Sequence, residues 1–138
     1  MTRVLYDVNV VLDVLADREG HAEASSAALG LTERGRVEGV IAAHTVTTLH
    51  YLLERELGRA KTRRVLTALL GVLEVEPVDG DRLRHALGLA WRDFEDAVQA
   101  ACAESARADY LVTRDPGGFK QSAVRVVSPA ELLALVGA

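Results

Sequence analysis

The chain of 138 residues has a single cysteine, Cys102, so it cannot form an intrachain disulfide. This scarcity is typical of proteins in a reducing compartment. No uncharged apolar run approaches the roughly 20 residues that a membrane-spanning helix requires. The N-terminal residues also lack the pattern of a secretory signal. We therefore expect a cytoplasmic protein without a membrane segment.

Ligands for zinc and loops for nucleotides are also missing. The four histidines show no ligand spacing with one another or with Cys102, which argues against a zinc site. No glycine-rich loop of the nucleotide-binding type is present. Cys102 follows two alanines inside an expected helix, and we interpret it as a small core residue.

The chain has no excess of basic residues, since its formal net charge is −4. A protein that binds nucleic acid by broad phosphate neutralisation is usually basic. Basic residues are dense only in one short stretch, at Arg55, Arg59, Lys61, Arg63 and Arg64. This stretch is either a solvated helix face or a patch that attracts phosphate, and the sequence leaves both interpretations open.

What the chain does contain is an alternation of strands and helices within one domain, residues 1–138. Its apolar fraction of 49% is sufficient for a packed core. We expect strands at 3–7, 38–42, 73–75, 109–113 and 125–127, and helices at 9–16, 20–35, 45–57, 60–70, 79–90, 93–107 and from Ser128 onward. The alternation predicts an α/β fold, with a parallel sheet covered by helices on both faces.

Four aspartates stand at the predicted ends of these elements. Asp7 closes the first strand and Asp115 follows the fourth, while Asp93 and Asp96 open a helix. In parallel α/β folds, the working site lies outside the carboxyl ends of the strands. Carboxylates that come from distant parts of the sequence and meet there are suitable ligands for a hard divalent cation. The pattern favours a metal-dependent enzyme.

Each aspartate also has a purely structural interpretation. Asp7 or Asn9 can cap the helix that follows, and Asp115 precedes a turn that contains Pro116. Asp93 is a natural N-cap, and Glu95 or Asp96 can complete a local capping network. The four together are harder to explain in this way than any one of them alone.

Three segments of the chain resemble the motifs of PIN domains, in the same order and with similar spacing. They are Tyr6-Asp7-Val8-Asn9-Val10-Val11-Leu12-Asp13, then Asp93-Phe94-Glu95-Asp96-Ala97-Val98-Gln99-Ala100-Ala101, and then Leu111-Val112-Thr113-Arg114-Asp115 followed by Phe119. The resemblance covers essentially the whole chain. It is closest to bacterial PIN proteins related to the toxins of VapBC-type toxin–antitoxin pairs.

The resemblance implies a three-layer α/β/α fold around a mostly parallel five-stranded sheet. It also implies an endoribonuclease that depends on Mg²⁺ or Mn²⁺ and cleaves single-stranded RNA. The protein partners that it implies are an antitoxin and a second copy of the chain, joined through helices around residues 45–70.

The same resemblance assigns roles to particular residues. Asp7, Asp96 and Asp115 match acidic metal positions, and Asp93 matches an extra acid that part of the family has. Asn9 and Thr113 match residues that support the carboxylates. Arg114 either contacts phosphate or forms an ion pair with one of the acids.

Two positions depart from the family pattern. Thr48 stands where many PIN domains carry a glutamate, and Gly118 stands where an aspartate often precedes the phenylalanine. Asp93 lies on the same helix face as Asp96, and we hypothesise that it offsets the missing acid. The departures also motivate an alternative function, a degenerate PIN module that binds RNA or a partner protein without cutting.

Overall fold

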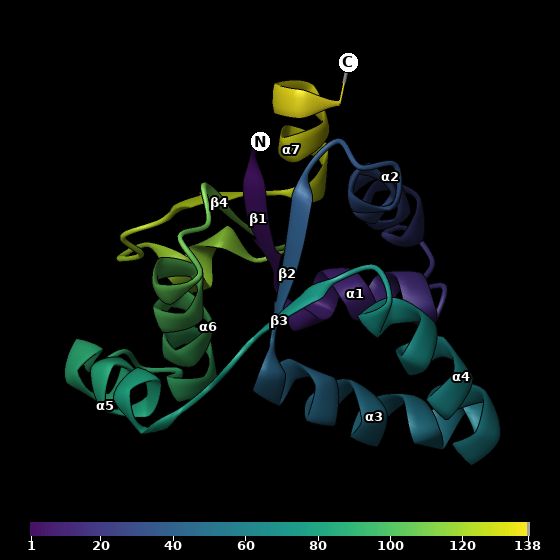
Figure 1. Ribbon diagram of the computed structural model, residues 1–138, viewed down its shortest axis with the longest axis horizontal. Coiled ribbons are helices and arrows are strands. Elements are labelled where there is room, and N and C mark those ends of the chain that lie inside the picture. Colours follow the sequence, from purple (N-terminus) through teal and green to yellow (C-terminus); the bar gives the residue numbers. More distant parts are fainter. Residues whose placement is uncertain (138) are drawn as a thin grey trace.

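A computed structural model describes residues 1–137 as three layers, a central sheet with helices on both faces (Figure 1). The strands are β1 (Arg3–Tyr6), β2 (Glu38–Ala42), β3 (Glu74–Glu76), β4 (Tyr110–Val112) and β5 (Arg125–Val127). They form one sheet in the order β3-β2-β1-β4-β5. Every neighbouring pair is parallel, so the predicted α/β fold and five-stranded sheet are confirmed.

The helices divide unequally between the two faces of the sheet (Figure 1). One face is covered by α1 (Val8–Leu15), α2 (Ala22–Glu33), α3 (Ala43–Leu57), α4 (Arg59–Leu70) and α7 (Pro129–Val136). The other is covered by α5 (Gly80–Leu89) and α6 (Phe94–Ser105). Each face buries its own apolar cluster, which gives the α/β/α layering that the PIN resemblance implies.

Alternation along the strands supplies both clusters. In β1, Val4 and Tyr6 point to the face of α1 and α2, while Leu5 points to the face of α6. This is the period of two that a strand buried on both faces requires. Tyr6 is fully buried, and its hydroxyl lies 2.9 Å from both the Ala28 carbonyl oxygen and the Thr32 hydroxyl, which links β1 to α2.

Alanines bring α6 close to the sheet. Every residue from Ala97 to Ala103 is buried, and four of these seven are alanine. Because alanine side chains are short, the helix axis can lie near the strands. Cys102 is fully buried in this row, as expected for a small core residue. The close packing places the acidic first turn of α6 beside the carboxyl ends of the strands.

Helix boundaries follow the capping residues. Ser128 and Glu131 form a reciprocal capping box at the start of α7, with Pro129 at its first position. The first strand is one residue shorter than predicted, because Asp7, whose N–H still donates to the Val112 carbonyl, accepts a hydrogen bond from Val8 N as the cap of α1. A short 3₁₀ helix, η1 (Pro116–Phe119), replaces the expected turn.

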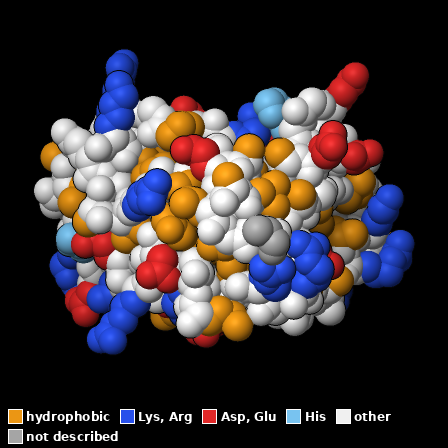
Figure 2. Space-filling model, turned by 90° about the horizontal axis from the view of Figure 1, so that it is seen from above, with side chains coloured by type: hydrophobic (Ala, Val, Ile, Leu, Met, Phe, Trp, Pro, Cys, Tyr) orange, Lys and Arg blue, Asp and Glu red, His pale blue; other side chains and the backbone are white. Residues whose placement is uncertain are grey.

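Arg3 holds the amino ends of the strands together, at the edge of the sheet opposite Asp7. Its guanidinium lies 2.7 Å from Glu74 and 3.2 Å from Glu38, and its Nε donates to the Ala106 carbonyl at 2.6 Å. Basic, acidic and hydrophobic side chains are interspersed on the face seen from this side (Figure 2). Within residues 1–137, no helix is long and apolar enough to cross a membrane.

The packing of β2 against α2 gives a testable prediction. A Cβ added at Gly39 would lie 2.7 Å from both Leu73 Cδ2 and Thr32 Cγ2, so Gly39→Ala must push two elements apart. We expect a loss of about 1–3 kcal/mol in the free energy of unfolding, measured by urea denaturation. Gly88→Ala is the matched control, because no atom lies within 4 Å of its added Cβ and the residue is helical. This control should gain about 0.5 kcal/mol.

Candidate active site

The candidate site lies where the strand order reverses, outside the carboxyl ends of β1 and β4. The chain runs from β1 outward through β2 and β3, and then returns to the other side of β1 as β4. The loops that leave β1 and β4 therefore diverge from one point, which is the usual ligand position in open parallel sheets. Asp7 directly follows β1, and Thr113, Arg114 and Asp115 follow β4.

Asp7 is the buried centre of the site, with an exposure of 4%. Its Oδ1 accepts hydrogen bonds from Val8 N at 2.8 Å and from Gln99 Nε2 at 3.1 Å. Its Oδ2 accepts one from the Thr113 hydroxyl at 2.8 Å. Burial raises the pKa of Asp7 above its ordinary value, although the three donors oppose that rise. Oδ2 accepts no second hydrogen bond from residues 1–137, so one of its lone pairs is available to a ligand.

Thr113 fixes the orientation of that carboxylate. Its Oγ1 accepts from Asp115 N at 3.1 Å and from Asn9 Nδ2 at 3.3 Å. The amide of Asn9 is oriented in turn, because its Oδ1 accepts from Arg114 N at 3.3 Å. With both acceptor positions of the hydroxyl occupied, its proton points to Asp7. Asn9 therefore supports Asp7 through Thr113 rather than by direct contact.

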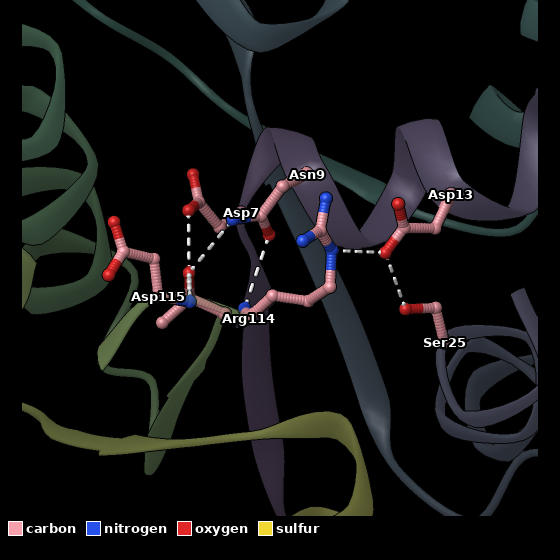
Figure 3. Close-up of polar contacts among 7 residues, drawn as sticks. Asp7, Asn9, Asp13, Ser25, Arg114 and Asp115 are labelled. Atoms are coloured by element: carbon pink, nitrogen blue, oxygen red, sulfur yellow. Dashed lines mark hydrogen bonds and ion pairs between the residues drawn. The ribbon is translucent and has the colours of Figure 1, made fainter. Parts of the chain in front are cut away.

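Arg114 forms an ion pair with an acid that the sequence did not single out. Its Nε lies 2.6 Å from Oδ2 of Asp13, which is fully buried and also accepts from Ser25 Oγ at 3.1 Å (Figure 3). The pair joins α1, α2 and the loop after β4. Of the two interpretations of Arg114, the ion pair is present. Its partner is Asp13 and not one of the four predicted aspartates.

The first turn of α6 supplies the other acids. Asp93 is exposed and caps the helix, because its Oδ1 accepts from Asp96 N at 3.1 Å. Asp96 is half-buried, and its pKa is raised to about 7 by burial first and then by the negative charges of Asp93, Asp7, Glu95 and Asp115. The structural interpretation of Asp93 is therefore correct, and its charge also acts on Asp96. The four predicted aspartates interact electrostatically as one group.

Besides Asp13, sequence reasoning missed Glu95, Gln99 and Thr45 at this site. Glu95 was taken for a capping residue, but its pKa is raised by burial and by the charges of Asp7 and Asp93, so it faces the same cluster. Gln99 was not considered, yet it is fully buried and its Nε2 donates both to Asp7 and to the Thr45 hydroxyl at 2.9 Å. The available signal was the helical spacing, since Gln99 follows Asp96 by three residues on the same face.

Both departures from the family pattern have a structural expression. Thr48 donates to the His44 carbonyl at 3.3 Å within α3, and the link from α3 to Asp7 passes instead through Thr45 and Gln99. A Cβ added at Gly118 would lie 2.8 Å from Asp96 Oδ2 and 3.7 Å from Asp115 Oδ2. The absent side chain at 118 therefore leaves room for the carboxylate of Asp96.

The donor set suits a hard cation in its chemistry. The pKa of Asp96 is raised to about 7 by burial and, after burial, by repulsion from four neighbouring carboxylates. A divalent cation would relieve that repulsion. As the side chains stand in residues 1–137, however, no three His, Cys, Asp or Glu residues are arranged to hold one ion. Binding would therefore require rotation of the carboxylates on α6 or after β4.

A model of the PIN domain matches residues 3–116, a span that contains all four aspartates. The chain belongs to the PIN-domain family. Comparison with curated protein sequences finds no significant match. The family assignment therefore comes from the domain model, and the fold described above agrees with it.

Solved structures of other PIN proteins share this fold. A toxin–antitoxin complex from Klebsiella pneumoniae aligns with a TM-score of 0.71 and 21% identity, over 91% of this chain and 97% of that chain. VapBC2 from Rickettsia felis, bound to a DNA fragment from its promoter, gives 0.69 and 14%, over 92% and 98%. Mycobacterium tuberculosis VapC20, a toxin that cleaves the Sarcin-Ricin loop, gives 0.64 and 16%, over 78% and 86%.

The raised pKa of Asp96 predicts how the stability of this PIN domain depends on pH. Between about pH 4 and pH 7 the folded protein retains a proton that the unfolded chain has released. The free energy of unfolding should therefore fall as the pH rises through this window and level off above it. In EDTA, Asp96→Asn should flatten the dependence and raise Tm at pH 8 by about 3 °C.

Thermal unfolding from pH 4.5 to pH 8.5 would measure this effect. Asp81→Asn is the control, because it removes an exposed carboxylate on α5 that pairs only with Arg84 among residues 1–137. It should leave the pH dependence as in the wild type. Equal slopes for the wild type and Asp96→Asn would contradict the prediction.

Proposed function

We propose that this PIN domain is a nuclease that depends on Mg²⁺ or Mn²⁺ and cleaves phosphodiester bonds of single-stranded RNA. The observation that carries the proposal is the convergence of carboxylates from β1, β4 and α6 at one edge of the sheet, with the pKa of Asp96 raised to about 7. Burial and the negative charges of the neighbouring carboxylates both raise this pKa, and groups with such perturbed pKa values cluster at functional sites. Cleavage of RNA by a PIN relative of the same fold is additional support.

Asp7, Asp96 and Asp115 would hold the cation, and Asp93 and Glu95 would add negative charge beside it. Asp7 would bind through Oδ2, the oxygen that accepts one hydrogen bond while Oδ1 accepts two. A bound divalent cation supplies positive charge for a phosphoryl oxygen and lowers the pKa of a coordinated water.

The surrounding residues would prepare the site for that chemistry. The Thr113 hydroxyl and the Gln99 amide hold the Asp7 carboxylate in one orientation, so little reorganisation is needed when substrate arrives. Arg114 is anchored through Nε to Asp13, and its side chain is 33% exposed. Its remaining guanidinium nitrogens would then contact a phosphate of the RNA.

A second candidate function rests on the side chain at position 48. Thr48 has no carboxylate, and its hydroxyl donates to the His44 carbonyl of its own helix. Among the hydrogen bonds within residues 1–137, α3 is linked to Asp7 only through the Thr45 hydroxyl and Gln99. A site with weakened cation affinity would bind RNA or a partner protein without cutting. Binding of RNA without cleavage at millimolar Mn²⁺ would favour this alternative.

An antitoxin would be the physiological partner of such a nuclease. Several structural neighbours are toxin–antitoxin complexes, and the negative site would attract a basic segment of a partner. We place a homodimer interface on α3 and α4, where Tyr51 is 66% and Leu70 is 43% exposed. The five basic residues from Arg55 to Arg64 are all exposed on the same two helices.

Cleavage can be tested with a single-stranded RNA labelled at its 5′ end. We expect Mg²⁺- or Mn²⁺-dependent cutting that leaves a 5′-phosphate on the downstream product, and loss of cutting in EDTA. Asp115→Asn should lower the rate by at least about 100-fold, since removal of groups that only support a metal ligand already costs about 10–100-fold. Asp115 is exposed, so the variant should keep the Tm of the wild type.

The control for contaminating nucleases is Asp81→Asn, purified in the same way. It should cut at the wild-type rate. Equal rates for the wild type and Asp115→Asn would show that the cutting does not come from this site. Absence of cutting on several unstructured RNAs, together with measured cation binding, would refute the nuclease function.

Asp93→Asn tests whether Asp93 offsets the acid that is absent at Thr48. Asparagine caps helices about as well as aspartate, so the variant removes the charge and keeps the cap. We expect weaker Mn²⁺ binding by isothermal titration calorimetry, by about threefold to tenfold, with an unchanged Tm in EDTA. Unchanged Mn²⁺ affinity would restrict Asp93 to its capping role.

A further inference from the structure

An open pocket adjoins the acidic cluster and has no role in the function proposed so far. It is formed by residues 90–96, which connect α5 to α6 and begin α6, and by Gly117, Gly118, Lys120 and Gln121 around η1. We call it the α6–η1 pocket. Its volume of about 860 Å³ is within the range of about 300–1,000 Å³ that small-molecule sites occupy. Asp93, Glu95 and Asp96 line it, so it is continuous with the acidic cluster.

The pocket presents an aromatic ring to solvent on a rigid base. Phe94, the first residue of α6, lines the pocket with an exposure of 44%. Trp91 also lines it and packs edge to face on Phe119, with 6.0 Å between ring centroids and 76° between planes. Phe119 is buried with an exposure of 2%. An exposed ring held beside a fixed aromatic pair is a suitable surface for stacking a planar base.

Two cations line the same pocket without a partner in the fold. Arg92 and Lys120 are exposed, and neither side chain forms a hydrogen bond or ion pair with any residue from 1 to 137. Exposed arginines on α3 and α4 are likewise unpaired among residues 1–137, but Arg92 and Lys120 lie in a pocket that the acidic cluster also lines. Cations that stay available beside an acidic cluster are suited to contact the phosphates of a strand that the cluster alone would repel.

We propose that the α6–η1 pocket binds the nucleotide next to the cleaved phosphodiester, with the unpaired base stacked on Phe94 and the phosphate against Arg92 and Lys120. The proposal rests on the nuclease function above and adds the place in the fold that binds one unpaired base of the single strand. Gly117 and Gly118 keep the passage between the pocket and the carboxylates open, because neither has a side chain. A base in a duplex is stacked on its neighbours and is not available to Phe94.

The single tryptophan of the chain, Trp91, is a built-in reporter of occupancy. Its fluorescence is titrated with a short single-stranded RNA oligonucleotide and, separately, with a duplex of the same sequence. The titration uses the Asp115→Asn protein in Mg²⁺, so that binding is measured without cleavage. We expect saturable quenching by the single strand, and Kd values for the duplex at least about tenfold higher.

Two surface variants test the proposed contacts, each with a matched control elsewhere. Phe94→Leu should raise Kd about tenfold and Phe94→Tyr should restore it, whereas Leu135→Ala, which removes an equally exposed apolar side chain from α7, should have no effect. Lys120→Gln should raise Kd and reduce the slope of log Kd against log salt by about 0.7. Arg34→Gln removes an exposed cation at the end of α2, outside the basic stretch of α3 and α4, and should leave both quantities unchanged.

The results separate failure of the pocket from failure of the nuclease function. If Phe94→Leu and Lys120→Gln cleave RNA at the wild-type rate and with the wild-type KM, the role of the pocket is refuted and the nuclease function stands. Binding with the expected variant effects, in a wild-type protein that does not cut, would support the pocket and refute the nuclease. Equal affinity for single strand and duplex would overturn the proposal. Unchanged RNA affinity in Phe94→Leu and Lys120→Gln would also overturn the proposal, and this outcome is expected if the pocket binds a peptide.

Discussion

A carboxylate that is buried beside other carboxylates must be compensated, and this requirement organises the end of the sheet where Asp7 lies. Asp7 is compensated from within the fold, by a backbone amide, an amide side chain and a hydroxyl. Asp96 has no such set of donors within residues 1–137, and burial together with the neighbouring negative charges raises its pKa to about 7. The fold thus compensates one carboxylate of the site by hydrogen bonds and leaves the other without them.

The topology explains why the charges gather at this point. Reversal of the strand order beside β1 separates the loops after β1 and β4, and the opening between them faces the first turn of α6. The alanine-rich face of α6 then sets the distance between that turn and the sheet. The buried residues of α6 include no charged side chain. Their packing on the sheet therefore determines how strongly Asp96 interacts with Asp7.

The sequence was sufficient for the fold because its signals are local. Apolar runs with turn residues between them, and caps such as Ser128 with Pro129, place each element within two or three residues. The four aspartates were found for the same reason, since they stand at element ends. Asp13, Gln99 and Thr45 were not found, because their partners are distant in sequence and a polar residue inside a helix carries no sign that it is buried. Glu95 was missed because a capping residue and a site residue occupy the same place at a helix start.

Gly118 has a consequence for how this site can change through substitution. A side chain at 118 would bring its Cβ to 2.8 Å from Asp96 Oδ2, so the Asp96 carboxylate would have to rotate to accommodate it. The effects of substitutions at 118 and 96 are therefore not independent, and each is harmful or harmless according to the other. A substitution at 118 would thus be felt first in the direction of the Asp96 side chain, on a different element from the position that changed.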